Sequence, residues 1–166
     1  MGWIDYENAV WTETWQALWE RSVQNAASSR RGQRMLRELR TALLDMPNKR
    51  LIPGALMVDG EVCPIGAMAW YRLKKGKAIE LPASNNPSAM LLSVADMEGF
   101  SWRAHQRGID LQETLRVGAA LGFVPCLAWT LVDLVDWHAN VFPPPTPEWL
   151  YQRVLKWVNE HIKEEQ

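Results

Sequence analysis

The chain has 166 residues, of which 48% are hydrophobic and 22% charged, and its formal net charge is −1. This length suits one globular domain over 1–166, and the apolar content is too high for a disordered chain. Two cysteines are too few for the disulfide framework of a small secreted domain. The unusual feature is tryptophan, with ten Trp against three Phe and three Tyr. Indoles either complete a small core or form a recognition surface, and composition leaves both interpretations open.

The start of the sequence and its longest uncharged run predict a cytoplasmic protein that does not associate with membranes. Residues 1–7 have neither the basic nor the apolar region of a secretory signal peptide. The uncharged run 117–132 is interrupted by two glycines and a proline, and it is shorter than the roughly 20 residues that a membrane span needs.

Charge is segregated along the chain. Residues 1–20 carry a net charge of −4, residues 21–77 carry +8, and residues 78–166 carry −5. Such segregation either creates surface fields that orient a partner or is neutralised within the fold.

Apolar residues at three- and four-residue spacing predict a Trp-rich helix over 5–27 and a basic helix over 30–46. The basic helix must end before Pro47, because a residue that precedes proline is pushed out of the α region. Asp59-Gly60 lies between two short apolar runs, which predicts one β-hairpin over 55–64. The pattern of residues 67–73 fits a short helix or a strand.

The second half of the chain contains a predicted loop, rich in Lys, Pro and Asn, over 74–87. A short helix is predicted around 89–97, a helix pair over 110–139, and a C-terminal helix over 147–163. The pattern does not assign 98–108. The fold class is therefore mainly α (α+β), a compact domain of five or six helices with one small β-hairpin.

Six basic residues are the first candidate site. Three arginines share one face of the basic helix, and the set is Arg30, Arg31, Arg34, Arg37, Lys49 and Arg50. Arginine forks suit carboxylates and phosphates, so the set could contact a partner protein or a nucleic acid. An ordinary solvated face, or pairing within the fold, explains the same pattern.

Four tryptophans of the first helix are the second candidate site. They recur at multiples of four residues and are Trp3, Trp11, Trp15 and Trp19. A protein interface and core packing both account for this stripe. A membrane surface does not suit it, because the polar residues of this helix are acidic and anionic lipid would repel them.

The sequence predicts no catalytic residue, metal site or cofactor. The helix pair has the residue spacing of a helix–turn–helix. Its second helix, however, carries Asp133 and Asp136 where a DNA-reading helix needs basic side chains. Together with Asn140 they could bind a hard cation, although a solvated helix face is the commoner explanation of such spacing. Cys63 has the setting of a small buried hydrophobe, and no phosphate-binding, dinucleotide or nucleophile-elbow motif occurs.

Three segments carry a resemblance. They are RRGQRMLREL over 30–39, MPNKRLI over 46–52 and DGEVCPIGA over 59–67, and together they span about 40 residues. This pattern resembles a family of small uncharacterised proteins encoded by bacteriophages and prophages of Gram-negative bacteria. The Trp-rich first helix and the loop 74–87 depart from the family pattern.

The resemblance implies a phage-related origin and no established activity. We therefore expect a phage or prophage accessory protein in the cytoplasm of a bacterial host. It would act without catalysis by binding a host or phage protein, and countering host defence is one such role. The alternative is a nucleic-acid-binding protein that uses the basic segment 30–50. A third alternative is an enzyme whose chemistry leaves no recognisable motif.

Overall fold

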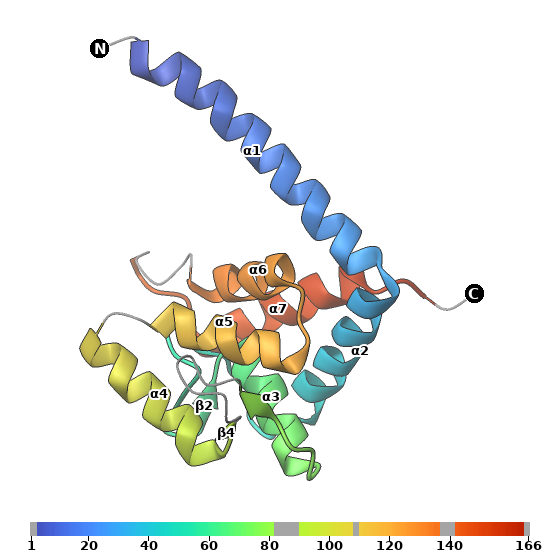
Figure 1. Ribbon diagram of the computed structural model, residues 1–166, viewed down its shortest axis with the longest axis vertical. Helices are drawn as coiled ribbons and strands as arrows, with labels where there is room; N and C mark the ends of the chain where they lie inside the picture. The colour runs from blue at the N-terminus through green and yellow to red at the C-terminus, as the bar shows by residue number, and fades with distance from the viewer. Residues whose placement is uncertain (1–2, 82–89, 108–109, 137–141, 165–166) are drawn as a thin grey trace.

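The computed structural model describes residues 3–81, 90–107, 110–136 and 142–164. Their side chains are described over 14–81, 90–100, 111–136 and 142–164. The described residues form seven α-helices and two small antiparallel sheets of two strands each (Figure 1). The chain is therefore mainly α with a small β-hairpin, as predicted, but it has more helices than the five or six expected.

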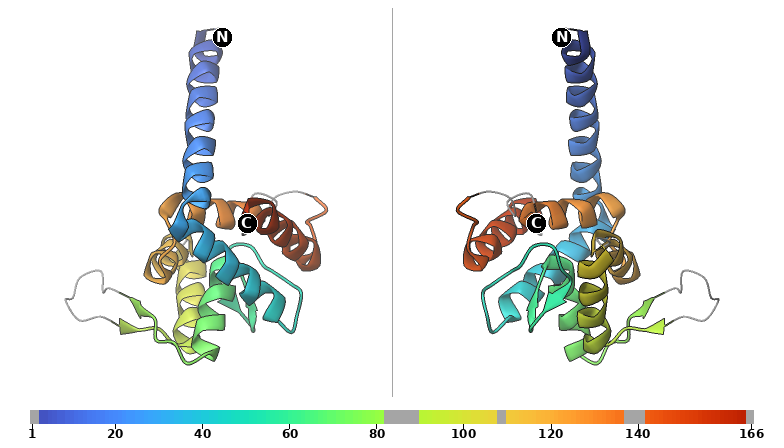
Figure 2. Two further views of the ribbon diagram at one scale, coloured as in Figure 1. Left: turned by 90° about the vertical axis from the view of Figure 1, so that its right-hand side faces the viewer. Right: turned by 90° about the vertical axis from the view of Figure 1, so that its left-hand side faces the viewer.

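The first helix projects from the rest of the molecule. α1 (Trp3–Ser28) has 26 residues and is about 39 Å long at the helical rise of about 1.5 Å per residue. Its last turns pack on α2 (Arg30–Asp45) and α6 (Pro125–Asp136), where Val23 and Ala27 are buried. Every described side chain from Thr14 to Ser22 is exposed. Figure 2 shows from two sides that the helix stands clear of the body.

A close approach at Gly32 sets the direction of α1 relative to α2. Ser29 ends α1 and caps α2, since its hydroxyl accepts a hydrogen bond from the Gly32 N–H at 3.0 Å. A Cβ on Gly32 would lie 1.9 Å from the carbonyl oxygen of Ala26 in the last turn of α1. Only glycine allows the two backbones to meet at this distance.

The buried amide of Gln33 closes the same junction. It donates hydrogen bonds to the carbonyls of Ala27 at 2.6 Å and His161 at 2.8 Å, and it accepts one from the Lys163 N–H at 2.7 Å. Both amide hydrogens and the amide oxygen therefore have partners, as a buried polar side chain requires. One side chain thereby joins the ends of α1, of α2 and of α7 (Pro147–His161).

The predicted hairpin is present and leads into a helix. β1 (Met57–Val58) pairs antiparallel with β2 (Glu61–Val62), and the turn residues Asp59 and Gly60 have φ values of 51° and 78°. Positive φ at both positions is what a tight two-residue hairpin needs. α3 (Pro64–Lys74) follows at once, so residues 67–73 are helical.

The predicted loop 74–87 contains the start of a second hairpin. β3 (Glu80–Leu81) pairs antiparallel with β4 (Met90–Leu91), and residues 82–89 lie outside the described part of the chain. The prediction of an exposed loop was wrong at Ile79 and Leu81, which are 3% and 0% exposed. These two apolar residues hold a lysine-rich segment on the core, and the surrounding polar residues conceal them in the sequence.

The helix predicted around 89–97 begins later than expected. α4 runs from Val94 to Arg107, because β4 occupies 90–91 and Ser93 and Asp96 cap the helix reciprocally. The Ser93 hydroxyl accepts from the Asp96 N–H at 3.1 Å, and the Asp96 carboxylate accepts from the Ser93 N–H at 2.9 Å. The unassigned segment 98–108 thus belongs to α4, apart from residue 108, which is not described.

The remaining helices follow the predicted order. α5 (Asp110–Leu121) ends at Gly122, α6 begins at Pro125, and Thr146 caps α7 through the Trp149 N–H at 3.2 Å. Residues 137–139 of the predicted helix pair lie outside the described residues. All seven helices contribute to one apolar core, α1 only through its last turns, and its fully buried members include Leu36, Leu39, Ile65, Met68, Leu127, Leu131 and Val154. Within the described residues, no helix combines the length and apolar content that crossing a membrane requires.

Replacing Gly32 tests the junction. We expect Gly32→Ala to lower the free energy of unfolding by about 3 kcal/mol, since its Cβ would overlap the Ala26 carbonyl. Urea denaturation followed by circular dichroism measures the change.

Gly99→Ala is the matched control, because Gly99 lies within α4 and a Cβ there meets no atom within 4 Å. This variant should be as stable as the wild type or gain up to about 1 kcal/mol. Equal losses in both variants would contradict the role of the close approach.

Candidate functional site

The exposed part of α1 carries bulky apolar side chains on one side. Trp15, Leu18 and Trp19 are 67%, 51% and 42% exposed. Their spacing of four and three residues places them on one helical face, which we call the Trp face. Trp3 and Trp11 also belong to α1, but their side chains lie outside the described residues. Of the four candidate tryptophans, Trp15 and Trp19 have described side chains, and both are exposed.

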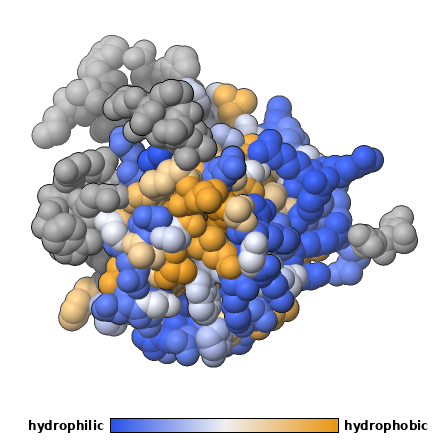
Figure 3. Space-filling model, turned by 60° about the horizontal axis from the view of Figure 1, so that its bottom comes forward, coloured by the Kyte–Doolittle hydropathy of each residue, from blue (hydrophilic) through white to orange (hydrophobic). Residues whose placement is uncertain are grey.

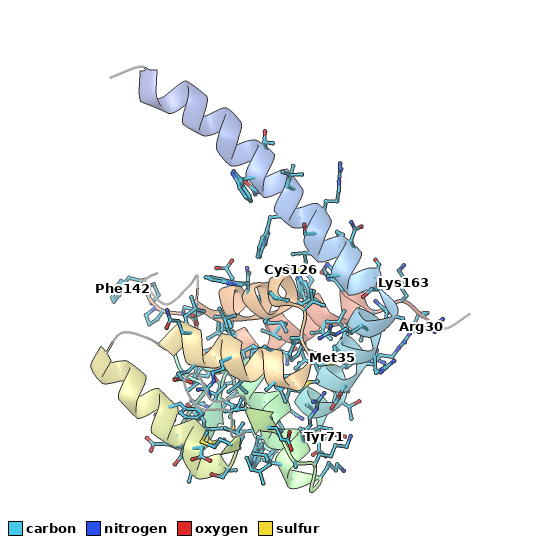
Figure 4. All side chains as sticks on the ribbon, in the orientation of Figure 1. Arg30, Met35, Tyr71, Cys126, Phe142 and Lys163 are labelled. Atoms are coloured by element: carbon cyan, nitrogen blue, oxygen red, sulfur yellow. The ribbon has the colours of Figure 1, made fainter. Side chains whose placement is uncertain are left out.

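The Trp face looks across to α6. Trp19 lines a hollow of about 240 Å³ together with Trp129, Thr130 and Asp133 of α6. Trp129 is 43% exposed, so two half-exposed indoles line the same hollow. Figure 4 shows Cys126, at the start of α6, beneath α1 where the two helices converge. The angle between α1 and α6 therefore forms an open wedge with aromatic walls.

A second hollow lies on the other side of Trp129. It has a volume of about 380 Å³ between α5 and α6, and its apolar lining includes Leu115, Ala119, Phe123 and Ala128. Trp129 lines both hollows, so it forms a ridge between them. The sequence left Trp129 undecided between core and surface. What identifies it is its position opposite Trp19, 110 residues earlier in the chain.

Four of the six basic candidates have structural partners. Arg31 Nε donates to the Gly122 carbonyl at 2.8 Å, and Arg37 Nη2 donates to the Lys163 carbonyl at 2.7 Å. Lys49 Nζ donates to the Leu44 carbonyl at 2.6 Å in the last turn of α2.

Arg50 is the fourth. Its Nε lies 2.7 Å from Oε1 of Glu61 and its Nη1 bonds to Glu148, so it joins β2 to α7. These contacts raise the pKa of Arg50, the hydrogen bond to Glu61 most of all. Pairing within the fold, one of the interpretations open from the sequence, therefore applies to these four residues.

Arg30 and Arg34 differ from the other four. Neither makes a hydrogen bond or an ion pair within the described part of the chain, and both are exposed. Figure 4 shows Arg30 pointing outward beside the C-terminal end, away from α6. The basic candidate site is thus reduced to two exposed arginines, with Arg40 on the same helix.

The aspartates of α6 have no further metal ligands beside them among the described residues. Asp136 accepts a hydrogen bond from the Gly54 N–H at 2.8 Å, and burial raises the pKa of Asp136, with a smaller contribution from Asp133. Among the described residues no three His, Cys, Asp or Glu side chains are placed to hold a metal. Asn140 lies outside these residues.

Cys63 is buried at the start of α3. Its Sγ accepts a hydrogen bond from the Gly66 N–H at 3.3 Å, yet burial outweighs this contact and raises the pKa of Cys63 to about 12. A thiol with this pKa remains protonated at neutral pH, and the thiolate is the nucleophile. Cys63 therefore serves as a cap and a core residue.

A further apolar area lies at the end of the body opposite α1 (Figure 3). Exposed apolar side chains near the two hairpins and the start of α4 include Val58, Leu91 and Val94. The wedge combines aromatic walls with a hydroxyl and a carboxylate in one hollow, so it is the better candidate site.

Thiol alkylation tests the state of the two cysteines. In the native protein at pH 8 we expect iodoacetamide to modify Cys126, which is half-buried, and to leave Cys63 unmodified. In denaturant both should react. Mass spectrometry of tryptic peptides gives the two rates, and similar native rates would contradict the assignment of Cys63 as inert.

Comparisons with known proteins add no family to this description. The chain matches no family model, no curated protein and no solved structure. Its function must therefore be inferred from the geometry of the wedge and from the resemblance of its motifs.

Proposed function

We propose that the chain is a phage or prophage accessory protein that acts without catalysis by binding a host or phage protein. The observation that carries this proposal is the Trp face, which stays exposed on α1 although it looks across to α6. Trp15 and Leu18 are more than half exposed although they lie on a regular helix.

The energetics favour a binding role for this face. A helix on a globular protein gains most of its stability by packing its apolar side, and none of the described side chains from Thr14 to Ser22 is buried. Tryptophan is enriched among the residues that dominate binding energy in protein interfaces. An exposed apolar stripe on a helix is also the element that helix-in-groove recognition uses. A partner that covers the stripe supplies the packing that the fold does not.

The phage-related origin rests on the three motif segments. They lie in α2, in the turn after it, and in the first hairpin with α3, whereas the Trp-rich helix departs from the family pattern. On this proposal the family part forms the scaffold, and α1 determines which protein this chain binds.

Substitutions on the Trp face test the proposal. Trp15→Ala and Trp19→Ala should each weaken binding to the partner by about 2 kcal/mol or more, as loss of a dominant interface residue does. Each should change the free energy of unfolding by less than about 0.5 kcal/mol, since exposed side chains contribute little to stability. Affinity capture from bacterial host lysate, followed by calorimetry with the purified partner, measures the loss.

Leu44→Ala is the control for these variants. Leu44 is 57% exposed but lies in the last turn of α2, at the end remote from α1. It should retain the partner at wild-type affinity. Retention of the same proteins by the two Trp variants would contradict the proposal.

Nucleic-acid binding is a second candidate, because Arg30, Arg34 and Arg40 have no partner within the described residues. Three arginines on phosphates would give a log–log salt slope of about −3. With the other four basic candidates engaged in the fold, we expect no measurable binding to duplex DNA at physiological salt. Fluorescence anisotropy over a salt titration decides this. A slope of about −3 that falls by about two units in an Arg30→Gln, Arg34→Gln double variant would favour the second candidate.

A further inference from the structure

The hollow between α1 and α6 has an unusual chemical composition. Its walls are the indoles of Trp19 and Trp129, and its polar groups are Thr130 and Asp133. The Thr130 hydroxyl donates its hydrogen to the Cys126 carbonyl at 2.7 Å, so its oxygen is left as an acceptor. Apart from the indole N–H groups, the hollow offers aromatic faces, a hydroxyl oxygen and a carboxylate.

The carboxylate of Asp133 is available to a ligand. It makes no hydrogen bond or ion pair within the described part of the chain, and the residue is exposed. Its neighbour Asp136 is already held by the Gly54 N–H. The negative charge of the hollow therefore lies on Asp133, beside the two indoles.

We propose that this hollow binds a cationic side chain, arginine or lysine, that the partner polypeptide presents to the Trp face. The inference rests on the proposed function and specifies the chemistry of the partner. The faces of indole rings attract cations, and tryptophan does so most strongly among the aromatic side chains. A carboxylate beside the rings adds a charge-assisted hydrogen bond, for which the planar guanidinium of arginine is the better donor.

The second hollow indicates which kind of side chain the partner carries next to its cationic one. It is lined mainly by apolar side chains and shares Trp129 with the first hollow. A polypeptide that crosses Trp129 therefore places neighbouring side chains on either side of the ridge. The partner segment carries a bulky apolar residue close to its basic one.

Other side chains fit the first hollow less well. An acidic side chain would be repelled by Asp133, and an apolar one would bury this carboxylate without a partner, which costs free energy. Only a cation satisfies both the aromatic walls and the carboxylate.

Two short peptides that differ only in charge test the proposal. Acetyl-Leu-Arg-amide and acetyl-Leu-citrulline-amide have nearly the same shape, but citrulline is neutral. We expect the arginine peptide to shift the indole N–H resonances of Trp19 and Trp129 in proton–nitrogen NMR spectra. It should bind about tenfold more tightly than the citrulline peptide. Trp19→Leu and Trp129→Leu assign the two resonances.

Asp133→Asn should remove this preference and leave the two peptides with similar affinities. Asp59→Asn is the matched control, because Asp59 is an exposed aspartate in the turn of the first hairpin and asparagine suits its positive φ. The control should keep the tenfold preference. Equal binding of both peptides to the wild type, absence of binding, or a preference that survives Asp133→Asn would overturn the proposal.

The outcome is separable from that of the proposed function. If Trp15→Ala loses the partner while the two peptides bind alike, the wedge is an interface but the cation site is wrong. If Trp15→Ala and Trp19→Ala retain the partner, the proposed function itself fails. Sedimentation velocity tests whether a second copy of this chain occupies the hollow. A dimer that Asp133→Asn dissociates would overturn the assignment of the hollow to a different polypeptide.

Discussion

The structure depends on one junction, where α1 turns into α2 and both meet the end of α7. The missing side chain of Gly32 lets the second helix approach the last carbonyls of the first. The amide of Gln33 donates both of its hydrogens to carbonyls of α1 and α7, two of the three helices that converge there. Because a buried amide left without partners is costly, these bonds hold the helices at one angle. That angle directs α1 outward and opens the wedge against α6.

The same junction contains residues of the motif segments singled out in the sequence. Arg31, Gly32 and Gln33 belong to the first matching segment, and each makes a contact between elements. In the other segments, Arg50 joins β2 to α7, and Cys63 caps α3. These five motif residues connect parts of the scaffold, whereas Arg30 and Arg34 of the first segment are exposed.

Residues that act through local rules were predictable from the sequence. Pro47, Asp59-Gly60 and Gly122 mark the end of α2, the turn of the first hairpin and the end of α5, because each acts through backbone conformation alone. Trp157 of α7 packs against the core and stacks on His161, with ring centroids 4.0 Å apart. The second hairpin was not predictable, because its strands have two residues each and their pairing spans a polar segment.

The candidate site was only half predictable for a related reason. Trp15 and Trp19 form a periodic stripe within one helix, so a local pattern indicates them. Asp133 and Trp129 belong to a helix with its own solvated face, and nothing near them in the sequence connects them to α1. Their position opposite Trp19 depends on the angle between α1 and α2, which is a property of the folded chain.

That angle also acts as a lever. About 20 residues of α1 extend beyond its buried foot, a span of about 30 Å at the helical rise. A rotation of only about 5° at Gly32 would displace the far end by about 3 Å, and it would displace Trp19, about 15 Å from the junction, by about 1 Å. Small changes in side-chain volume around Ala26 and Gly32 would therefore change the distance between α1 and α6. The shape of the proposed binding surface is thus set at the junction, outside the hollow itself.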